Sequence, residues 1–253
     1  MKKSTYFLII IFILFSFFFY QDPYAMEESK ILIAPNLENI LGCDNLGRDI
    51  FSRLLLGSFY TLMIAFISAT LAVGVGTFIG SIAGYYGKVI DGIVMTFVEV
   101  IMSIPGILIS LGIIIVLGTG FHSLIVAIFI IYIPRCINVV RGLVKKEKNM
   151  EYIIAAKTYG VSDLRIIYRH ILPNILKPIL VAFTTGFAGA ILTEAGLGYL
   201  GLGIQPPYPT WGNMLNQSQS YFISSPWFTI APGLVIVFTV YQIKKLEKRG
   251  RKS

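Results

Sequence analysis

The sequence predicts an all-helical protein that crosses a membrane several times. Apolar residues make up 55% of its 253 positions and charged residues only 13%, and the mean hydropathy is +0.75. Soluble domains carry about 25% charged residues, so this composition lies outside their usual range. The apolar runs are also continuous, whereas a strand of a membrane barrel would alternate polar and apolar residues. We therefore predict an all-α polytopic membrane protein.

Six apolar runs predict its transmembrane helices. A helix needs about 20 residues to cross the hydrocarbon core. Five runs reach or approach this length: 59–84, 92–117, 121–140, 175–193 and 227–243. The sixth, Tyr6 to Tyr20, is shorter and follows Lys2 and Lys3, so it is either an uncleaved first helix or a secretory signal peptide. Pro23 stands at the candidate cleavage site, where a small residue is needed, and this argues against cleavage.

Lysine and arginine predict the orientation, because the cytoplasmic loops of membrane proteins carry an excess of both. With the N-terminus inside, 18 of the 21 Lys and Arg residues fall at or near the cytoplasmic side, and three fall outside: Lys30, Arg48 and Arg53. We therefore expect both termini in the cytoplasm. The net charge of +8 is explained by cytoplasmic loops and by a tail that favours anionic membrane lipid, so no nucleic-acid partner is expected.

The same pattern divides the chain into three parts. Residues 1–58 are expected to form the N-terminal helix and an extracytoplasmic segment, and residues 59–243 the transmembrane domain. Residues 244–253 form a basic cytoplasmic tail.

A polar segment, residues 151–174, interrupts the apolar pattern between the fourth and fifth predicted helices. Its first part is rich in helix-forming residues, including Ala155 and Ala156, and contains no proline. Gly160 predicts the end of this helix, because glycine readily adopts the left-handed conformation of a C-terminal cap. Two alanines permit the close approach of another protein, so we interpret the segment as a cytoplasmic docking element. The alternative is a solvated helical loop.

A second short helix is predicted after this turn. Ser162 is a candidate N-cap, and Asp163 would lie in the first turn, where a negative charge suits the helix dipole. Pro173 ends the segment before the fifth membrane helix. The predicted apolar face of this helix comprises four residues: Leu164, Ile167, Ile171 and Leu172.

The arrangement of Ala155-Ala156, Gly160 and the closing Ile171-Leu172-Pro173 resembles the cytoplasmic signature loop of ABC-importer permeases. In that family the loop forms a coupling helix that inserts into the ATPase subunit. The resemblance therefore implies a type I ABC importer permease fold, in which six transmembrane helices carry the coupling loop, about 145–174, between helices 4 and 5. It assigns ATPase coupling to eight residues: Glu151, Ala155, Ala156, Gly160, Asp163, Arg165, His170 and Pro173.

Further stretches narrow the resemblance to the C-type permease subunit of dipeptide, oligopeptide and nickel importers. Two of them are LGCDNLGRDIFSR, residues 41–53, and EAGLGYLGLGIQPPYPTWGNML, residues 194–215. With GSIAGYYGKVIDG, residues 80–92, and the kink expected at Ser103-Ile104-Pro105, the resemblance covers about residues 41–240.

This family implies the partners and the setting. A homologous permease would complete a heterodimer that forms an alternating-access path for small peptides, with nickel or a metal chelate as the alternative substrate. Two ABC ATPase subunits would bind ATP and Mg, and an extracytoplasmic substrate-binding protein would deliver the substrate. The expected location is the cell (inner) membrane of a bacterium or archaeon.

Three features depart from the family pattern. Ile154 occupies the position where a Glu usually precedes the alanine pair, and Cys43 stands where Thr is commoner. The last span ends in VYQIKKLEKRGRKS, which is basic where the family ending is polar and acidic.

Small residues recur along the predicted membrane helices. Gly76, Gly80 and Gly84 follow one another at four-residue intervals in the second helix, and Gly186 takes part in a similar pattern in the fifth. Small residues on one helical face let membrane helices approach closely. These faces are predicted to pack against other helices, either of this chain or of the partner permease.

Two carboxylates and a proline are the candidate gating residues. A charge inside a span is costly unless it faces protein or water. Glu99 is predicted either to pair with Arg135 or Arg141 or to act in gating, and Glu194 to lie near the translocation path. Pro105 is expected to kink the third helix, and Pro134 the fourth.

No motif for catalysis is present in the sequence. A phosphate-binding loop is missing because Gly87-Lys88 is followed by Val89, and neither a zinc-protease histidine pair nor a G-x-S-x-G motif occurs. His122 and His170 are expected in a wet loop and on the docking surface rather than at a metal. We therefore expect no catalytic residue, metal site or cofactor in this chain. An intramembrane enzyme or a channel is the remote alternative.

Overall fold

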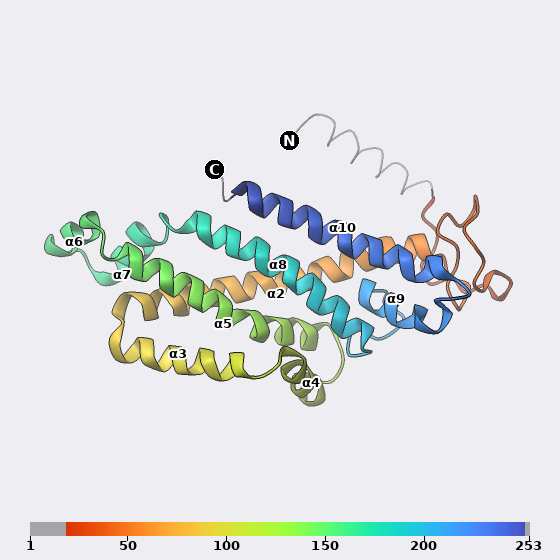
Figure 1. The fold of residues 1–253 in the computed structure, drawn as a ribbon, viewed down its shortest axis with the longest axis horizontal. Helices are drawn as coiled ribbons and strands as arrows, with labels where there is room; N and C mark the ends of the chain where they lie inside the picture. Colours follow the sequence, from red (N-terminus) through yellow and green to blue (C-terminus); the bar gives the residue numbers. More distant parts are fainter. Residues whose placement is uncertain (1–18, 251–253) are drawn as a thin grey trace. The chain divides into compact units, whose positions relative to one another are not determined.

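The described part of the chain folds into helices. A computed structural model describes residues 19–250, and each named element in this range is a helix (Figure 1). The predicted first helix, Tyr6 to Tyr20, lies largely outside the described residues. The chain divides into two compact units. The first unit combines the segment up to Leu62 with Ala195–Phe238, and the second unit combines Met63–Glu194 with the segment from Thr239 onward.

Four predicted membrane spans are single long helices. Each is apolar and long enough to cross a membrane: α2 (Ile50–Tyr86), α5 (Phe121–Glu147), α8 (Leu176–Tyr199) and α10 (Pro226–Gly250). At 1.5 Å per residue α2 is about 55 Å long, so it extends past a hydrocarbon core of about 30 Å. Short elements include the 3-10 helices η1 (Glu28–Lys30) and η3 (Gln219–Tyr221).

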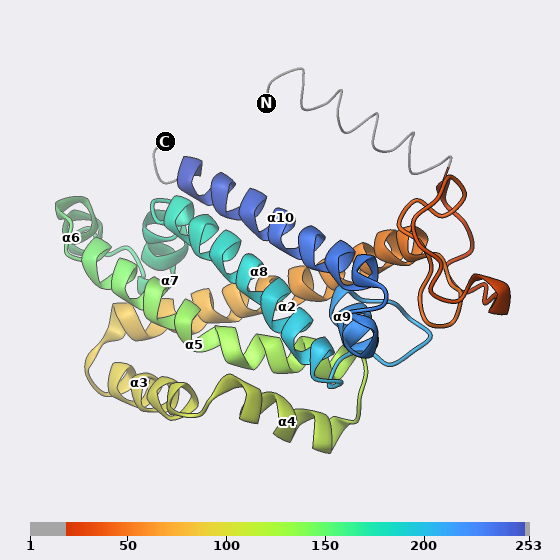
Figure 2. The ribbon, with the colours of Figure 1, turned by 45° about the vertical axis from the view of Figure 1, so that its right-hand side comes forward.

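The third predicted span is broken rather than kinked. Two helices, α3 (Lys88–Ser103) and α4 (Gly106–Leu117), replace the single helix expected over 92–117, and their axes differ by 91° (Figure 2). The break follows from Pro105, because the residue before a proline avoids the helical conformation. Ile104 is accordingly extended, with φ −95° and ψ 128°. With this pair counted as one span, the described residues contain five of the six predicted helices.

The fourth predicted span shows the opposite behaviour at its proline. Pro134 is buried within α5, and the helix continues past it to Glu147. The expected kink at Pro134 therefore does not interrupt the helix, unlike the break at Pro105.

Glycines of α2 lie directly against α5 in the second unit. A Cβ atom built on Gly76 would be 2.6 Å from the Cβ of Cys136, and one on Gly80 would be 2.8 Å from the carbonyl oxygen of Ile137. Gly84 is equally close to the Arg141 carbonyl. Gly186 behaves differently, since nothing lies within 4 Å of a Cβ built there. The close contact of α8 is instead made by Gly189, against the Tyr132 ring of α5.

The first unit is organised around Trp211, which begins α9 (Trp211–Ser218) and is buried. Its indole N–H lies 3.2 Å from the Ser58 hydroxyl, and its backbone N–H donates to the Thr61 hydroxyl at 3.2 Å. Backbone crowding favours glycine nearby: a Cβ on Gly198 would lie 2.8 Å from the Cα of Gly212. The stretches at 41–53 and 194–215 thus belong to one packed unit, together with the start of α2.

Candidate functional site

The polar segment between α5 and α8 begins with the helix that the sequence predicts. The helix α6 comprises Glu151–Thr158 and has Tyr159 as its C-cap, and the following Gly160 has φ +78°. The Gly160 N–H donates to the Lys157 carbonyl at 3.0 Å, and the Val161 N–H donates to the Ala156 carbonyl at 3.1 Å. This pair of bonds is a Schellman motif, which satisfies carbonyl groups left open at a helix end. The predicted end of this helix at Gly160 is confirmed.

The second helix differs from the prediction. It consists of one α-turn, α7 (Asp163–Arg165), followed by the π-helix η2 (Ile166–Ile171). A π-helix pairs residues five apart, and the Leu172 N–H accordingly donates to the Ile167 carbonyl at 2.9 Å. The wider turn moves Ile166 into the buried face and leaves Leu164 62% exposed. The predicted apolar face is therefore wrong at Leu164, because it assumed the spacing of an α-helix.

The side-chain cap expected from Ser162 is also absent, and a different hydrogen bond holds the start of α7. Ser162 occupies the N-cap position but makes no side-chain cap bond. The Asp163 carboxylate instead accepts a hydrogen bond of 2.6 Å from the Tyr85 hydroxyl at the end of α2. The Lys148 ammonium donates to the Tyr85 carbonyl at 3.1 Å. Tyr85 therefore joins α2 to Lys148, just before the segment, and to α7 in its middle.

A second network closes the segment on itself. The Tyr152 hydroxyl donates to the Glu147 carboxylate and accepts from the Asn174 amide at 2.7 Å. The same amide donates to the His170 carbonyl at 2.8 Å. Partial burial, and then the bond to Glu147, raise the pKa of Tyr152. Beneath these contacts lies an apolar core that joins the segment to α5 and α8: Val140, Val144, Ile153, Ile166, Ile171, Ile175 and Ile179.

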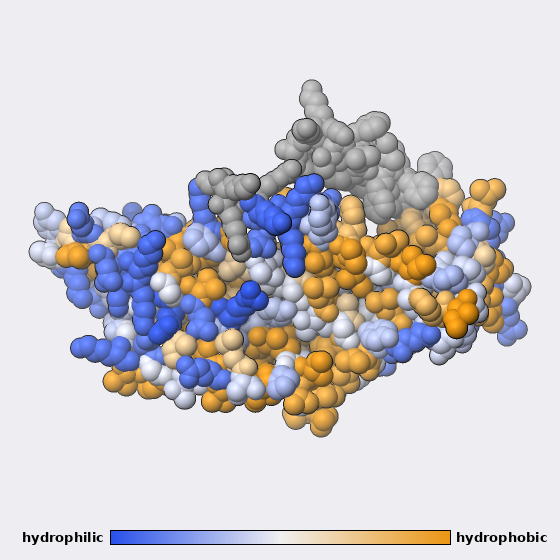
Figure 3. All heavy atoms as spheres, viewed as in Figure 1, coloured by the Kyte–Doolittle hydropathy of each residue, from blue (hydrophilic) through white to orange (hydrophobic). Residues whose placement is uncertain are grey.

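The surface of this segment combines charged and apolar side chains. Hydrophilic residues predominate around α6 and α7 (Figure 3), and Tyr159, at the tip of the turn, is 88% exposed. A cavity of about 380 Å³ lies beside α6 and includes Lys157 and the exposed Ile154 in its lining. Of the eight predicted coupling residues, five are exposed: Glu151, Ala155, Gly160, Arg165 and Pro173. Three are half-buried: Ala156, Asp163 and His170.

The predicted ion pair of Glu99 is not formed. Arg141 binds Asp91 of α3 instead, with a distance of 2.8 Å between Nη2 and Oδ2, and Lys145 binds the same carboxylate at 2.6 Å. Glu99 is exposed on α3, and no ion pair joins it to an arginine among residues 19–250. A pairing with Arg135 or Arg141 is therefore wrong, because Asp91 lies nearer the cationic end of α5. Glu194 is fully buried in α8.

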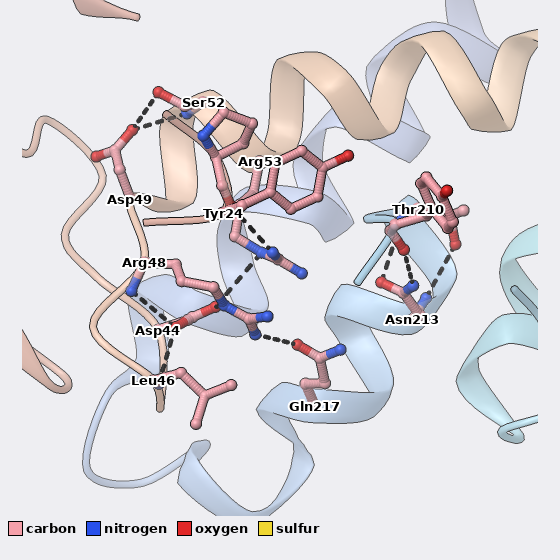
Figure 4. Close-up of polar contacts among 12 residues, drawn as sticks. Tyr24, Asp44, Leu46, Arg48, Asp49, Ser52, Arg53, Thr210, Asn213 and Gln217 are labelled. Carbon is pink, nitrogen blue, oxygen red and sulfur yellow. Dashed lines mark hydrogen bonds and ion pairs between the residues drawn. The ribbon is translucent and has the colours of Figure 1, made fainter. Parts of the chain in front are cut away.

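Buried charges hold the first unit together (Figure 4). The Asp44 carboxylate binds Arg48 at 2.7 Å and Arg53 at 3.4 Å, and Arg48 also donates to Gln217 of α9 at 3.0 Å. Thr210 caps α9 through reciprocal hydrogen bonds with Asn213. The bond from Arg48 to Gln217 links the stretch 41–53 to α9, whose first residues belong to the stretch 194–215.

A second carboxylate and two raised pKa values complete the electrostatics of this unit. Asp49 accepts hydrogen bonds from Ser52 at 2.7 Å and from the Asn39 amide at 2.9 Å. Burial raises the pKa of Tyr24 to about 12, with a smaller contribution from Tyr60. Burial likewise raises the pKa of the Cys43 thiol to about 11. The thiol is therefore protonated and unreactive near neutral pH.

Several of these residues were not identified from the sequence. Tyr85, Tyr152 and Asn174 gave no distinct signal, although Tyr85 lies in the stretch 80–92 that resembles the family. Within the described residues no group of three or more His, Cys, Asp and Glu could hold a metal ion.

The long apolar helices are those of a multi-pass membrane protein. The chain belongs to the family of binding-protein-dependent transport system inner membrane components, whose defining region matches residues 76–246. This membership confirms the family that the sequence resembles.

Named relatives cover most of the chain. The dipeptide transport system permease protein DppC of Alkalihalophilus pseudofirmus is 41% identical over 214 residues, which cover 85% of this chain and 70% of that protein. The glutathione transport system permease protein GsiD of Pectobacterium atrosepticum is 38% identical over 225 residues, with 87% and 75% covered.

Solved structures share the fold. The MetNI methionine ABC transporter in an inward-facing conformation matches with a TM-score of 0.66 at 21% identity, covering 79% of this chain and 95% of that chain. An amino acid ABC transporter matches with a TM-score of 0.58 at 18% identity, covering 79% and 94%. The predicted ABC importer permease fold is thereby confirmed.

Proposed function

We propose that this chain is a permease subunit of an ATP-driven importer of small peptides. Its family membership supports the role of a transport subunit. Relatives at 41% and 38% identity are named for the transport of dipeptides and of glutathione, respectively, and both are short peptides. These names favour a peptide over nickel or a metal chelate. A homologous permease would supply the other half of an alternating-access path.

The segment from Glu151 to Pro173 is proposed to receive the motion of the ATPase. The observation that carries this proposal is the turn at Tyr159 and Gly160, called the knuckle below. There the Schellman motif ends α6 and leaves the Tyr159 side chain almost fully exposed to solvent. The exposed Ala155 would permit the close approach of a groove on the ATPase subunit. Ile154 is also exposed, so an apolar contact would replace the charge that usually precedes the alanine pair.

A segment that transmits motion must be held rigidly against the membrane helices, and the contacts of this segment hold it in this way. Tyr85 binds Asp163 and Lys148, while the isoleucine core fixes the inner face. Movement of the knuckle would therefore reach α2, α5 and α8 together. We propose that this segment and both termini lie in the cytoplasm, in keeping with the distribution of Lys and Arg. ATP and Mg would be bound by separate ATPase subunits.

Replacement of Gly160 tests the coupling role. Gly160→Val should reduce uptake of a labelled dipeptide by about tenfold or more, because valine avoids the left-handed conformation at a cost of about 1–3 kcal/mol. Uptake would be measured in cells that express the complete transport system and the binding protein, with nickel uptake measured in parallel. The amount of chain in the membrane should not change.

Gly142→Ala is the matched control, since Gly142 lies within α5 and nothing is within 4 Å of a Cβ built there. It should leave uptake near the wild-type rate. Wild-type uptake by Gly160→Val would contradict the coupling role. Uptake of nickel but not of peptide by the wild-type system would contradict the proposed substrate class.

A further inference from the structure

Arg135 places a charge inside the apolar run 121–140 of α5. It lies five residues before the C-terminal end of this run, which is about 8 Å at 1.5 Å per residue. Charged side chains at such a depth occur where they face protein or water, and they mark substrate pathways or ion pairs. The surroundings of Arg135 therefore decide its role.

The guanidinium of Arg135 is exposed on the second unit. Among the described residues it makes no ion pair or hydrogen bond, whereas Arg141, less than two turns further along α5, is bound by Asp91. Arg135 thus retains its donors for a group outside this chain.

A cavity of about 160 Å³ opens beside this side chain, between α5 and α8. Gly186 enlarges it, because the cavity wall carries no side chain there. Its polar groups are Arg135 and the hydroxyls of Tyr132 and Thr185, and the rest of the wall is largely aliphatic. A liquid water molecule occupies about 30 Å³, so the cavity can admit a carboxylate with adjoining atoms but not a long peptide.

The neighbouring helix α3 also carries an exposed carboxylate, Glu99. The Asn138 amide is 3.7 Å from the Met102 sulfur, which places this part of α5 beside α3. The two helices run antiparallel, since Asp91 pairs with Arg141 and Lys145 further along α5. Arg135 and Glu99 therefore lie on opposite sides of the Asn138–Met102 contact, about 9 Å apart along the helix axes. Both charged side chains are exposed. The second unit therefore presents an exposed cation and an exposed anion that are not paired with each other.

We propose that Arg135 binds the C-terminal carboxylate of the transported peptide during its passage through the membrane. The planar guanidinium offers two parallel donors to a carboxylate, which is the geometry of the strong bidentate pair. The cavity beside it would hold the last side chain. This inference rests on the proposed peptide substrate.

Chemical modification of arginine tests the site directly. Membranes that contain the complete importer, without nucleotide, would be treated with phenylglyoxal, and the modified arginines would be mapped by mass spectrometry. Arg135 should react, and a dipeptide with a free carboxylate at millimolar concentration should slow its modification at least threefold. The C-terminal amide of the same dipeptide should give no protection. Arg141 is the internal control, and neither peptide should change its rate.

Three results would overturn the inference. An unreactive Arg135 would indicate that the partner permease covers it, equal protection by acid and amide would exclude carboxylate recognition, and no protection by either would exclude binding there. The proposed function is tested separately by dipeptide uptake in the same cells. Normal uptake without protection of Arg135 refutes only the carboxylate site, whereas absent uptake refutes the proposed substrate class.

Discussion

Asp44 is the counter-ion for two arginines in the first unit. Its carboxylate binds Arg48 and Arg53, and it also accepts the backbone N–H of Leu46 at 2.9 Å. The side chains of Asp44, Arg48 and Arg53 are each at most 2% exposed. Buried charges of this kind depend on one another, because removal of one partner leaves the others uncompensated in a poorly solvating interior.

Asp44→Asn is therefore expected to destabilise the protein by about 3–5 kcal/mol, which is typical when one partner of a buried ion pair is removed. The measurement is the thermal unfolding of the purified protein in detergent. Glu27→Gln is the matched control, since Glu27 is exposed and its ion pair with the half-buried Lys30 should contribute little. Equal melting temperatures for the two variants would contradict the role assigned to Asp44.

At the scale of elements, the contact of α2 with α5 depends on three glycines. The backbone of α5 lies so close to Gly80 that an added Cβ would press on the Ile137 carbonyl oxygen. Gly74 lies in the same helix with nothing within 4 Å of its built Cβ. The two positions thus differ in packing but share the same helical backbone.

Gly80→Ala should destabilise the second unit by about 1–3 kcal/mol through overpacking. Gly74→Ala should be neutral, or stabilising by up to about 1 kcal/mol, because alanine favours the helix. Thermal unfolding of both variants measures the difference. If both substitutions shift the melting temperature equally, the close contact between the helices is not as described.

The hydrogen bond between Tyr85 and Asp163 holds α7 against α2, and its removal is a second test at this scale. Tyr85→Phe removes one hydrogen bond, worth about 0.5–1.5 kcal/mol, between α2 and α7. The segment should open more often, so limited trypsin digestion at Arg165 or Arg169 should be a few-fold faster. Tyr86→Phe is the control, because Tyr86 is an exposed neighbour of Tyr85. Equal digestion rates of the two variants would show that the bond does not restrain the segment.

Some element boundaries could be predicted from local chemistry alone. Gly160 ends α6 because glycine adopts the left-handed conformation of the cap without strain, and Pro105 marks a break because it restricts Ile104. The π-helix at Ile166–Ile171 could not be predicted, since its spacing results from burying Ile166 and Ile171 in the apolar core shared with α5 and α8. The break at Pro105 was underestimated for a related reason: local chemistry predicts a disturbance but not its angle.

At the scale of the molecule, composition was sufficient to predict the membrane helices. The motifs and their spacing were sufficient to predict the family. Interactions between distant segments were harder to predict. Asp91 and Arg141 are 50 residues apart, and a pairing with Glu99 was expected because charge and depth alone do not distinguish the two carboxylates. Tyr85 was missed because a tyrosine at a helix end has many possible partners. The candidate site was therefore predictable as a surface segment, but its attachments to the membrane helices were not.

The central claim is that the knuckle at Tyr159 contacts an ATPase subunit, and photo-cross-linking tests it most directly. The photoreactive residue p-benzoylphenylalanine would replace Tyr159 in the complete importer, with Leu37 of the first unit, 94% exposed, as the control position. We predict that irradiation joins this chain to an ATPase subunit from position 159 and not from position 37. The absence of this adduct at position 159, or equal adducts at both positions, would contradict the proposed coupling.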